Sequence, residues 1–139
     1  MNILRVLTEK RKVGNAGEDA AALFLKKKGF KILERNYCPL DAEIDIIAEN
    51  KDTIAFIEVK TRTIGKESYN EPRPASAVTP EKQRKIIKTA KYYLGTAPRD
   101  KHISLDVIEV YLTESKKAQE ILHFENAFNL NSARKAKLR

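Results

Sequence analysis

Two short segments of the sequence carry acidic and basic side chains in an arrangement suited to chemistry on a phosphate. They are Glu43-Ile44-Asp45 and Glu58-Val59-Lys60, separated by a turn-forming stretch at residues 50–52. Both lie in runs rich in β-branched apolar residues, which predicts two antiparallel strands over residues 43–48 and 54–60. Because strand side chains alternate between faces, the charged residues of each segment share a face.

The pairing of these strands decides what the charged residues can do. If the apolar rows of both strands, with Ile44 and Ile46 in one row, lie on the core together, Asp45 lies opposite Glu58. Cβ atoms of opposed residues are about 4.5–5.5 Å apart, so an Asp–Glu pair there needs a compensating cation. Mg²⁺ or Mn²⁺ is the natural candidate, since Mg²⁺ binds one or two carboxylates together with water and phosphate oxygens.

The same register places Glu43, as an accessory acid, opposite Lys60. The Lys60 ammonium would then lie beside a bound phosphate, where it could orient the attacking water or stabilise charge in the transition state. The alternative is an ion-pair network at the edge of the sheet, with Glu43 paired to Lys60 and Asp45 bonded to the backbone. The pattern alone leaves both interpretations open.

Two predicted helices must approach this face. The first runs over about residues 15–28 and the second over 79–94, where Thr79 caps a helix that begins with proline and stops at Gly95. Each carries one polar side chain among apolar neighbours, Glu18 and Gln83. A buried amide needs a partner, such as a site carboxylate, water or phosphate. The alternatives are an ordinary first-turn charge for Glu18 and a backbone partner for Gln83.

The remaining pattern completes one α/β domain over residues 1–139. Further strands are predicted over 30–37, 104–111 and 120–124, and residues 61–78, which hold Gly65 and two prolines, are expected to form a long loop. The order α-β-β-β-α-β-β indicates a mixed β-sheet flanked by helices. The basic ends, at about 1–12 and 132–139, are expected to be mobile.

Charge favours a polyanionic partner. Lysine and arginine total 27 against 19 acidic residues, a net charge of +8, which favours DNA. The alternative for each basic residue is a solvated charge. Candidate phosphate contacts are Arg62, Lys66 and Arg73 in the loop and Lys82, Arg84 and Lys88 on the second helix.

Cysteine and hydropathy patterns favour a cytoplasmic protein without a membrane partner. The single Cys38 cannot form an internal disulfide, and no Cys/His cluster has zinc-site spacing. No stretch approaches the roughly 18 apolar residues of a membrane span. His102 and His123 have no evident partner in the sequence and receive no role.

An ordered series of motifs resembles the YraN-like family of small bacterial proteins. Asp45 with Glu58-Val59-Lys60 looks like the D…(D/E)-x-K signature of restriction-endonuclease-like nucleases, the PD-(D/E)xK superfamily. Other matching pieces are Gly14-Asn15-Ala16-Gly17-Glu18, Arg35-Asn36-Tyr37, Phe56-Ile57-Glu58-Val59-Lys60-Thr61-Arg62, Lys82-Gln83-Arg84, Asp106-Val107 and Asn126-Ala127-Phe128.

The resemblance implies a restriction-endonuclease-like fold, similar to that of archaeal Holliday-junction resolvases. It implies that Asp45 and Glu58 bind Mg²⁺ or Mn²⁺ with the carbonyl of Val59, that Lys60 assists the water, and that Glu18 is an accessory acid. Because such resolvases often act as dimers, it also implies a homodimer.

The leading hypothesis is therefore a metal-dependent nuclease that hydrolyses phosphodiester bonds of DNA, in branched or damaged structures. One alternative is a nucleic-acid-binding module that keeps the nuclease fold without catalysis. Another is a protein-interaction subunit whose basic surface meets an acidic partner.

Overall fold

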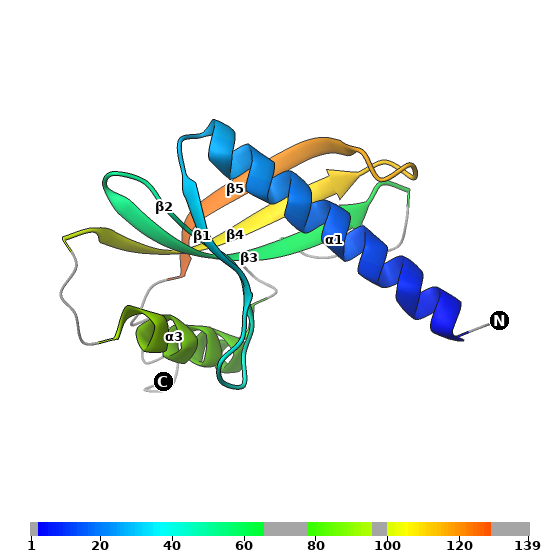
Figure 1. Cartoon of the computed structure of the whole chain (residues 1–139). Helices are drawn as coiled ribbons and strands as arrows, with labels where there is room; N and C mark the ends of the chain where they lie inside the picture. Colours follow the sequence, from blue (N-terminus) through cyan, green and yellow to red (C-terminus); the bar gives the residue numbers. More distant parts are fainter. Residues whose placement is uncertain (1–2, 66–77, 96–99, 129–139) are drawn as a thin grey trace.

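A five-stranded mixed sheet lies between two helices. The computed structural model describes residues 3–65, 78–95 and 100–128, and within these ranges α1 (Ile3–Lys27) covers one face of the sheet and α3 (Pro80–Leu94) the other (Figure 1). The sheet order is β1-β2-β3-β4-β5, in which β3 and β4 run parallel and the other neighbours antiparallel. The strands are β1 (Lys31–Tyr37), β2 (Ile44–Glu49), β3 (Thr53–Thr63), β4 (His102–Leu112) and β5 (Ala118–Phe128). This element order confirms the predicted fold class.

The central strands contribute side chains to two hydrophobic cores, one on each face of the sheet. Ala55 and Ile57 of β3 pack with Leu25 of α1, whereas Phe56, between them, packs with Ile86 of α3. All five side chains are at most 5% exposed. Alternation along β3 therefore fixes which side chains face which helix, and Glu58 and Lys60 continue the row that faces α3.

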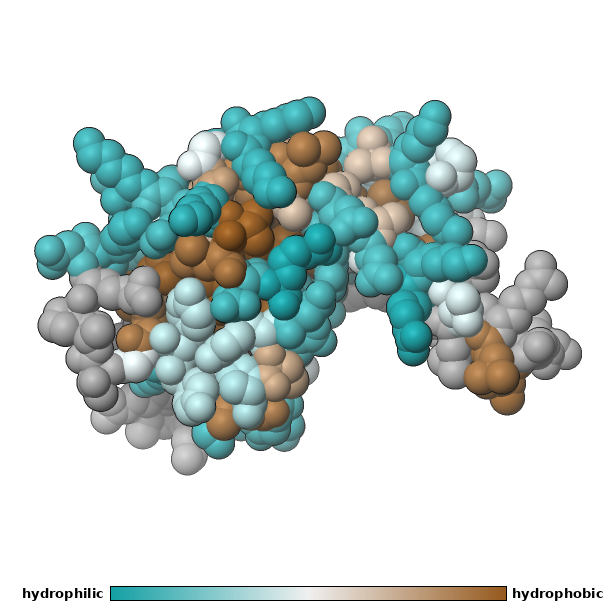
Figure 2. All heavy atoms as spheres, viewed as in Figure 1, coloured by the Kyte–Doolittle hydropathy of each residue, from teal (hydrophilic) through white to brown (hydrophobic). Residues whose placement is uncertain are grey.

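The first helix is longer than predicted. It begins at Ile3 rather than near Asn15, so residues 3–12, expected as a separate lead-in, continue the helix. The segment is rich in leucine, lysine and arginine and contains no proline, so a glycine at position 14 does not interrupt it. Its free end projects past the sheet (Figure 1) and presents apolar surface (Figure 2), where Ile3 and Leu4 are each 73% exposed. The basic segment 132–139 lies outside the described residues.

The third strand is also longer than predicted. It continues to Thr63 instead of ending at Lys60, because it pairs with β4 as far as Thr63 opposite Leu112. The expectation of a loop from residue 61 is therefore wrong for its first three residues. Arg62 is not a loop residue available to DNA: its side chain is 4% exposed in β3, and its Nε lies 3.4 Å from Oε1 of Glu109.

The second predicted helix has the expected ends. The Thr79 hydroxyl accepts a hydrogen bond from the Lys82 amide at 3.2 Å, and Gly95, with φ 62°, follows the last residue. A side-chain oxygen at the N-cap satisfies an amide that the helix cannot, and a glycine tolerates the positive φ that ends it. The backbone of Lys82 is thus fixed in the first turn of α3.

Helix α1 approaches β3 closely at Gly17. A Cβ atom added at this position would lie 1.9 Å from Oγ1 of Thr61, a distance that no real side chain adopts. Gly17 is therefore required for the contact between α1 and β3. The next residue, Glu18, is brought to the sheet by the same contact.

We predict opposite effects of alanine at two glycines of α1. Gly17→Ala should destabilise the protein by about 1–3 kcal/mol, because Thr61 or the helix must shift. Gly14→Ala should be neutral or stabilise by up to about 1 kcal/mol, since no atom lies within 4 Å of its added Cβ and alanine is the better helix former. Urea unfolding measures both, and equal effects of the two substitutions would contradict the close contact.

Candidate active site

The two charged segments meet at one cleft beside α3. The cleft has a volume of about 320 Å³ and contains both predicted metal-binding carboxylates. Its lining residues are Asp41, Ala42, Glu43, Asp45, Glu58, Lys82, Lys85 and Ile86. Asp45 and Glu58 therefore lie on the same side of the sheet, as the sequence predicts.

The predicted register of β2 and β3 is confirmed where the two strands pair. Ile46 lies opposite Ile57, and the pairing continues in step to Glu49 opposite Ile54. Beyond Ile46 the strands part: Oδ2 of Asp45 accepts a hydrogen bond from the Val59 amide at 2.7 Å. The carboxylate takes the place of a backbone partner, so its position is fixed by the strand it faces.

Two details of the predicted hairpin are wrong at this end. Ile44 packs with the α3-side core while Ile46 packs on the α1 side, so the apolar row breaks at Asp45. Glu43 was predicted to lie opposite Lys60, but it precedes β2, and its Oε1 accepts a hydrogen bond from Nδ2 of Asn36 at 2.7 Å. Lys60 pairs with Glu58 instead. Both differences follow from the parting of the strands, which ends regular alternation.

Asp45 is surrounded by other carboxylates. Burial, together with smaller contributions from the negative charges of Glu18, Glu58 and Glu43, raises the pKa of the Asp45 carboxyl from 3.8 to about 7. The hydrogen bond from the Val59 amide opposes this rise. The surroundings of Asp45 thus disfavour its negative charge, and a bound cation would offset that cost.

Glu58 uses its two oxygens differently. Its Oε1 lies 3.2 Å from Nζ of Lys60 and is also in direct contact with Nζ of Lys82. Its Oε2 is buried and, among the residues that the structure describes, has no hydrogen-bond partner. A buried oxygen without a hydrogen-bond partner costs free energy unless another group contacts it, and a bound metal ion is one group that could do so.

The donor set is suited to a cation that keeps water or phosphate ligands. Within the described residues, no group of three or more His, Cys, Asp or Glu side chains is arranged to hold a metal ion by itself. Mg²⁺ does not need such a cage, because it is commonly bound by one or two carboxylates plus substrate phosphates. Asp45 and the open oxygen of Glu58 fit this kind of site.

Two residues of β1, unassigned from sequence, organise the flanking acids. The side-chain amide of Asn36 donates to both oxygens of Glu18, at 3.3 and 3.1 Å, in addition to its bond with Glu43. Arg35 lies 3.7 Å from Glu18 and 2.9 Å from Asp19. Asn36 has φ 52°, a conformation that asparagine tolerates better than most residues. Glu18 is therefore held beside the site rather than extended into solvent.

Lys82, not Gln83, reaches the carboxylates from α3. The Gln83 amide donates to the carbonyl of Val78 at 2.9 Å, which is the backbone alternative considered from the sequence. Burial tends to lower the pKa of Lys82, but the hydrogen bond and charge of Glu58 outweigh it and raise the pKa. Lys82 therefore remains an ammonium in contact with Glu58.

The other predicted DNA contacts have different positions. Arg84 and Lys88 are exposed on α3, and Lys85, which was not predicted, lines the cleft. Lys66 and Arg73 lie outside the described residues. Among the described residues, the basic side chains that line the cleft are thus Lys82 and Lys85 of α3.

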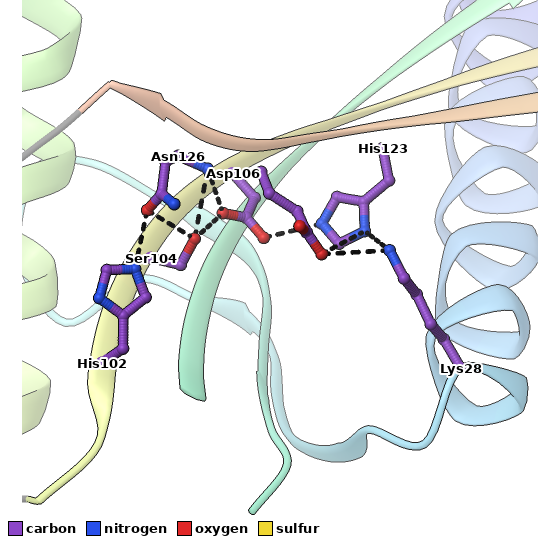
Figure 3. Close-up of polar contacts among 7 residues, drawn as sticks. Lys28, His102, Ser104, Asp106, His123 and Asn126 are labelled. Carbon is purple, nitrogen blue, oxygen red and sulfur yellow. Dashed lines mark hydrogen bonds and ion pairs between the residues drawn. The ribbon is translucent and has the colours of Figure 1, made fainter. Parts of the chain in front are cut away.

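A second polar cluster gives His102 and His123 the partners that the sequence did not reveal (Figure 3). Nε2 of His123 lies 2.7 Å from Oδ2 of Asp106, and both side chains are at most 3% exposed. Ser104 and the amide of Asn126 bind the other Asp106 oxygen. His102 Nε2 lies 3.0 Å from Oδ1 of Asn126.

This cluster also ties α1 to the sheet. Nζ of Lys28, which directly follows α1, lies 2.9 Å from Nδ1 of His123 in β5. Both oxygens of Asp106 already have hydrogen-bond partners, so we interpret the cluster as a structural network that joins α1, β4 and β5.

We predict that Asp45→Asn makes the metal-free protein more stable than wild type, and that this difference in stability grows as pH rises. An acid whose pKa is higher in the folded state loses stabilisation between its unfolded and folded pKa values, here between 3.8 and about 7. Asparagine keeps the acceptor for Val59 without the charge. The gain in the free energy of unfolding should therefore grow across this range and reach on the order of 4 kcal/mol above pH 7.

Urea unfolding at several pH values, with a chelator present, measures this gain. Asp52→Asn, an exposed change at the other end of the β2–β3 hairpin, is the matched control for the removal of one acidic side chain. An Asp45→Asn gain that does not vary with pH would contradict the raised pKa.

Comparisons with known proteins identify the family. A model described as "Uncharacterised protein family UPF0102" matches residues 17–110. A UPF0102 protein of Caldanaerobacter subterraneus is 45% identical over 121 residues, covering 86% of this chain and 96% of the relative. A UPF0102 protein of Clostridium acetobutylicum is 41% identical, covering 86% of this chain and 96% of the relative. One of Chlorobium phaeobacteroides is 44% identical, covering 84% of this chain and 92% of the relative. None of the helices in the described part is long and apolar enough to cross a membrane. The chain belongs to the UPF0102 family, the YraN-like family that its motifs resemble.

Proposed function

We propose that this protein is a metal-dependent nuclease that hydrolyses phosphodiester bonds of DNA. The observation that carries the proposal is the convergence of Asp45 and Glu58 on one cleft, with a buried open oxygen on Glu58 and the Lys60 ammonium beside it. Two carboxylates, one of them with an open oxygen, can hold a divalent cation that assists phosphodiester hydrolysis, and an ammonium beside them can stabilise charge in the transition state.

Each residue of the site has a role in this proposal. Asp45, Glu58 and the Val59 carbonyl would hold Mg²⁺ or Mn²⁺. When bound, such a cation lowers the pKa of its water and stabilises charge on the phosphate. The Lys60 ammonium, within 3.2 Å of Glu58, is positioned to orient the water and stabilise the developing charge.

The flanking acids complete the negative face of the site. Asn36 holds Glu18 and Glu43 by its single amide nitrogen, so both carboxylates stay next to Asp45. They increase the attraction for a divalent cation without needing to contact it. Glu18 is the accessory acid of this arrangement.

Charge supports DNA as the substrate. The chain has a net charge of +8, and the cleft itself carries Lys82 and Lys85. Exposed basic groups continue along α3 at Arg84 and Lys88, a surface suited to the DNA backbone. Action on branched or damaged DNA, as a homodimer, is the finer form of the proposal and derives from the resemblance to resolvases. A cytoplasmic location derives from the single cysteine and the hydropathy pattern.

Lys60→Met should abolish most cutting. The protein is incubated with duplex, single-stranded, nicked and four-way-junction DNA in the presence of Mn²⁺. Loss of a group that stabilises transition-state charge should lower the rate by at least about 100-fold. Lys51→Met, an exposed change in the turn of the same hairpin, should leave the rate unchanged.

The outcome distinguishes the alternatives. Cutting that survives Lys60→Met or Asp45→Asn would come from a contaminant and refute the proposal. Binding that weakens steeply with salt, without any cutting, would identify a DNA-binding module. Failure to retard any DNA at low salt, with a protein partner recovered instead, would identify an interaction subunit.

A further inference from the structure

Two lysine side chains form ion pairs with Glu58 in the metal-free protein. Lys60 approaches Oε1 from two residues along β3, and Lys82 approaches the same oxygen from α3. Glu58 itself is 13% exposed, so its charge has little contact with water. The second lysine brings a positive charge to the carboxylate on which the proposed cation would bind.

The two lysines differ in their position, because Lys82 lines the cleft and Lys60 is not among its lining residues. Lys60 lies in a strand paired on β4 opposite Glu109, and its side chain is 32% exposed. Lys82 lies in the capped first turn of α3, and its side chain is 44% exposed and opens onto the cleft. The flexible stem of a lysine can swing from the cleft without any change in the helix.

We propose that Lys82 is a built-in counter-ion of Glu58 that a divalent cation displaces, and that the displaced ammonium then binds a phosphate of the nucleic acid. This inference rests on the proposed metal site. An ammonium and a divalent cation on one carboxylate repel each other strongly in a partly buried cleft. Occupancy of Glu58 by one therefore lowers its affinity for the other.

The exchange couples metal binding to DNA binding. With the cation bound, Lys82 is no longer held by Glu58 and is available to a phosphate at the mouth of the cleft. By linkage, the factor by which DNA increases the affinity for the cation must equal the factor by which the cation increases the affinity for DNA. The protein would thus hold its cation most tightly when its substrate is present.

Lys82→Met tests the displacement without any measure of activity. Binding of Mn²⁺ to the purified variants is followed by the electron paramagnetic resonance signal of the free ion, in the absence of DNA. Removing the competing ammonium should tighten Mn²⁺ binding by about fivefold or more, the lower end of ordinary coupling between sites. Lys82→Arg, which keeps the charge, should remain close to wild type.

Lys85→Met is the matched control for net charge. Lys85 lines the same cleft one turn after Glu81, to which it pairs at 3.8 Å, and no contact with Glu58 is recorded within the described residues. Its loss removes one positive charge from the cleft and should change Mn²⁺ affinity by less than about twofold. Equal tightening by Lys82→Met and Lys85→Met would overturn the inference, because a general charge effect would then explain both.

The same titrations separate this inference from the proposed function. If wild type and Lys82→Met bind Mn²⁺ equally and Asp45→Asn abolishes binding, the metal site stands and only the displacement is wrong. If no variant binds Mn²⁺, both the metal site and the displacement are wrong. Tighter binding by Lys82→Met that Asp45→Asn abolishes supports both.

Discussion

The hydrogen bond from the Val59 amide to Asp45 is the interaction on which the site depends. The strands β2 and β3 pair regularly up to Ile46 and Ile57 and then part, and the Asp45 carboxylate satisfies the amide that loses its strand partner. A buried amide must have an acceptor, so the same requirement that stabilises the sheet also holds Asp45 at the mouth of the opening. The opening itself exposes Glu58 to the cleft.

This arrangement is electrostatically costly, and several elements share in offsetting it. Gly17 allows α1 to lie on β3 and bring Glu18 near, while Asn36 of β1 bridges Glu18 and Glu43. On the other side the capped start of α3 supplies Lys82. A group of acids that repel one another is kept together by contacts from both faces of the sheet, which is consistent with a site preorganised for a cation.

Local signals in the sequence predicted some features well. The ends of α3 were predictable because Thr79, Pro80 and Gly95 determine helix termini through nearby backbone contacts. The register of β2 and β3 was predictable because Ile46 and Ala48 share one core with Ala55 and Ile57, and because a short turn joins the two strands. The positions of Asp45 and Glu58 in a common cleft followed from that register.

The features that sequence reasoning missed depend on distant partners. β3 extends past Lys60 only because β4 pairs with it, and Arg62 is buried there beside Glu109. The contact between Lys28 and His123 joins residues 95 positions apart, and no local pattern reports such a pair. Asn36 lies within a recognisable motif, but its role appears only when α1 and β2 converge on it.

The most direct test is a crystal structure of the protein soaked in Mn²⁺, with the ion located by its anomalous scattering. We expect a peak within bonding distance of Asp45 and of Glu58 Oε2, with the Lys82 side chain withdrawn from Glu58. A fully occupied structure with no peak in this cleft, or with Mn²⁺ bound only elsewhere, would contradict this expectation.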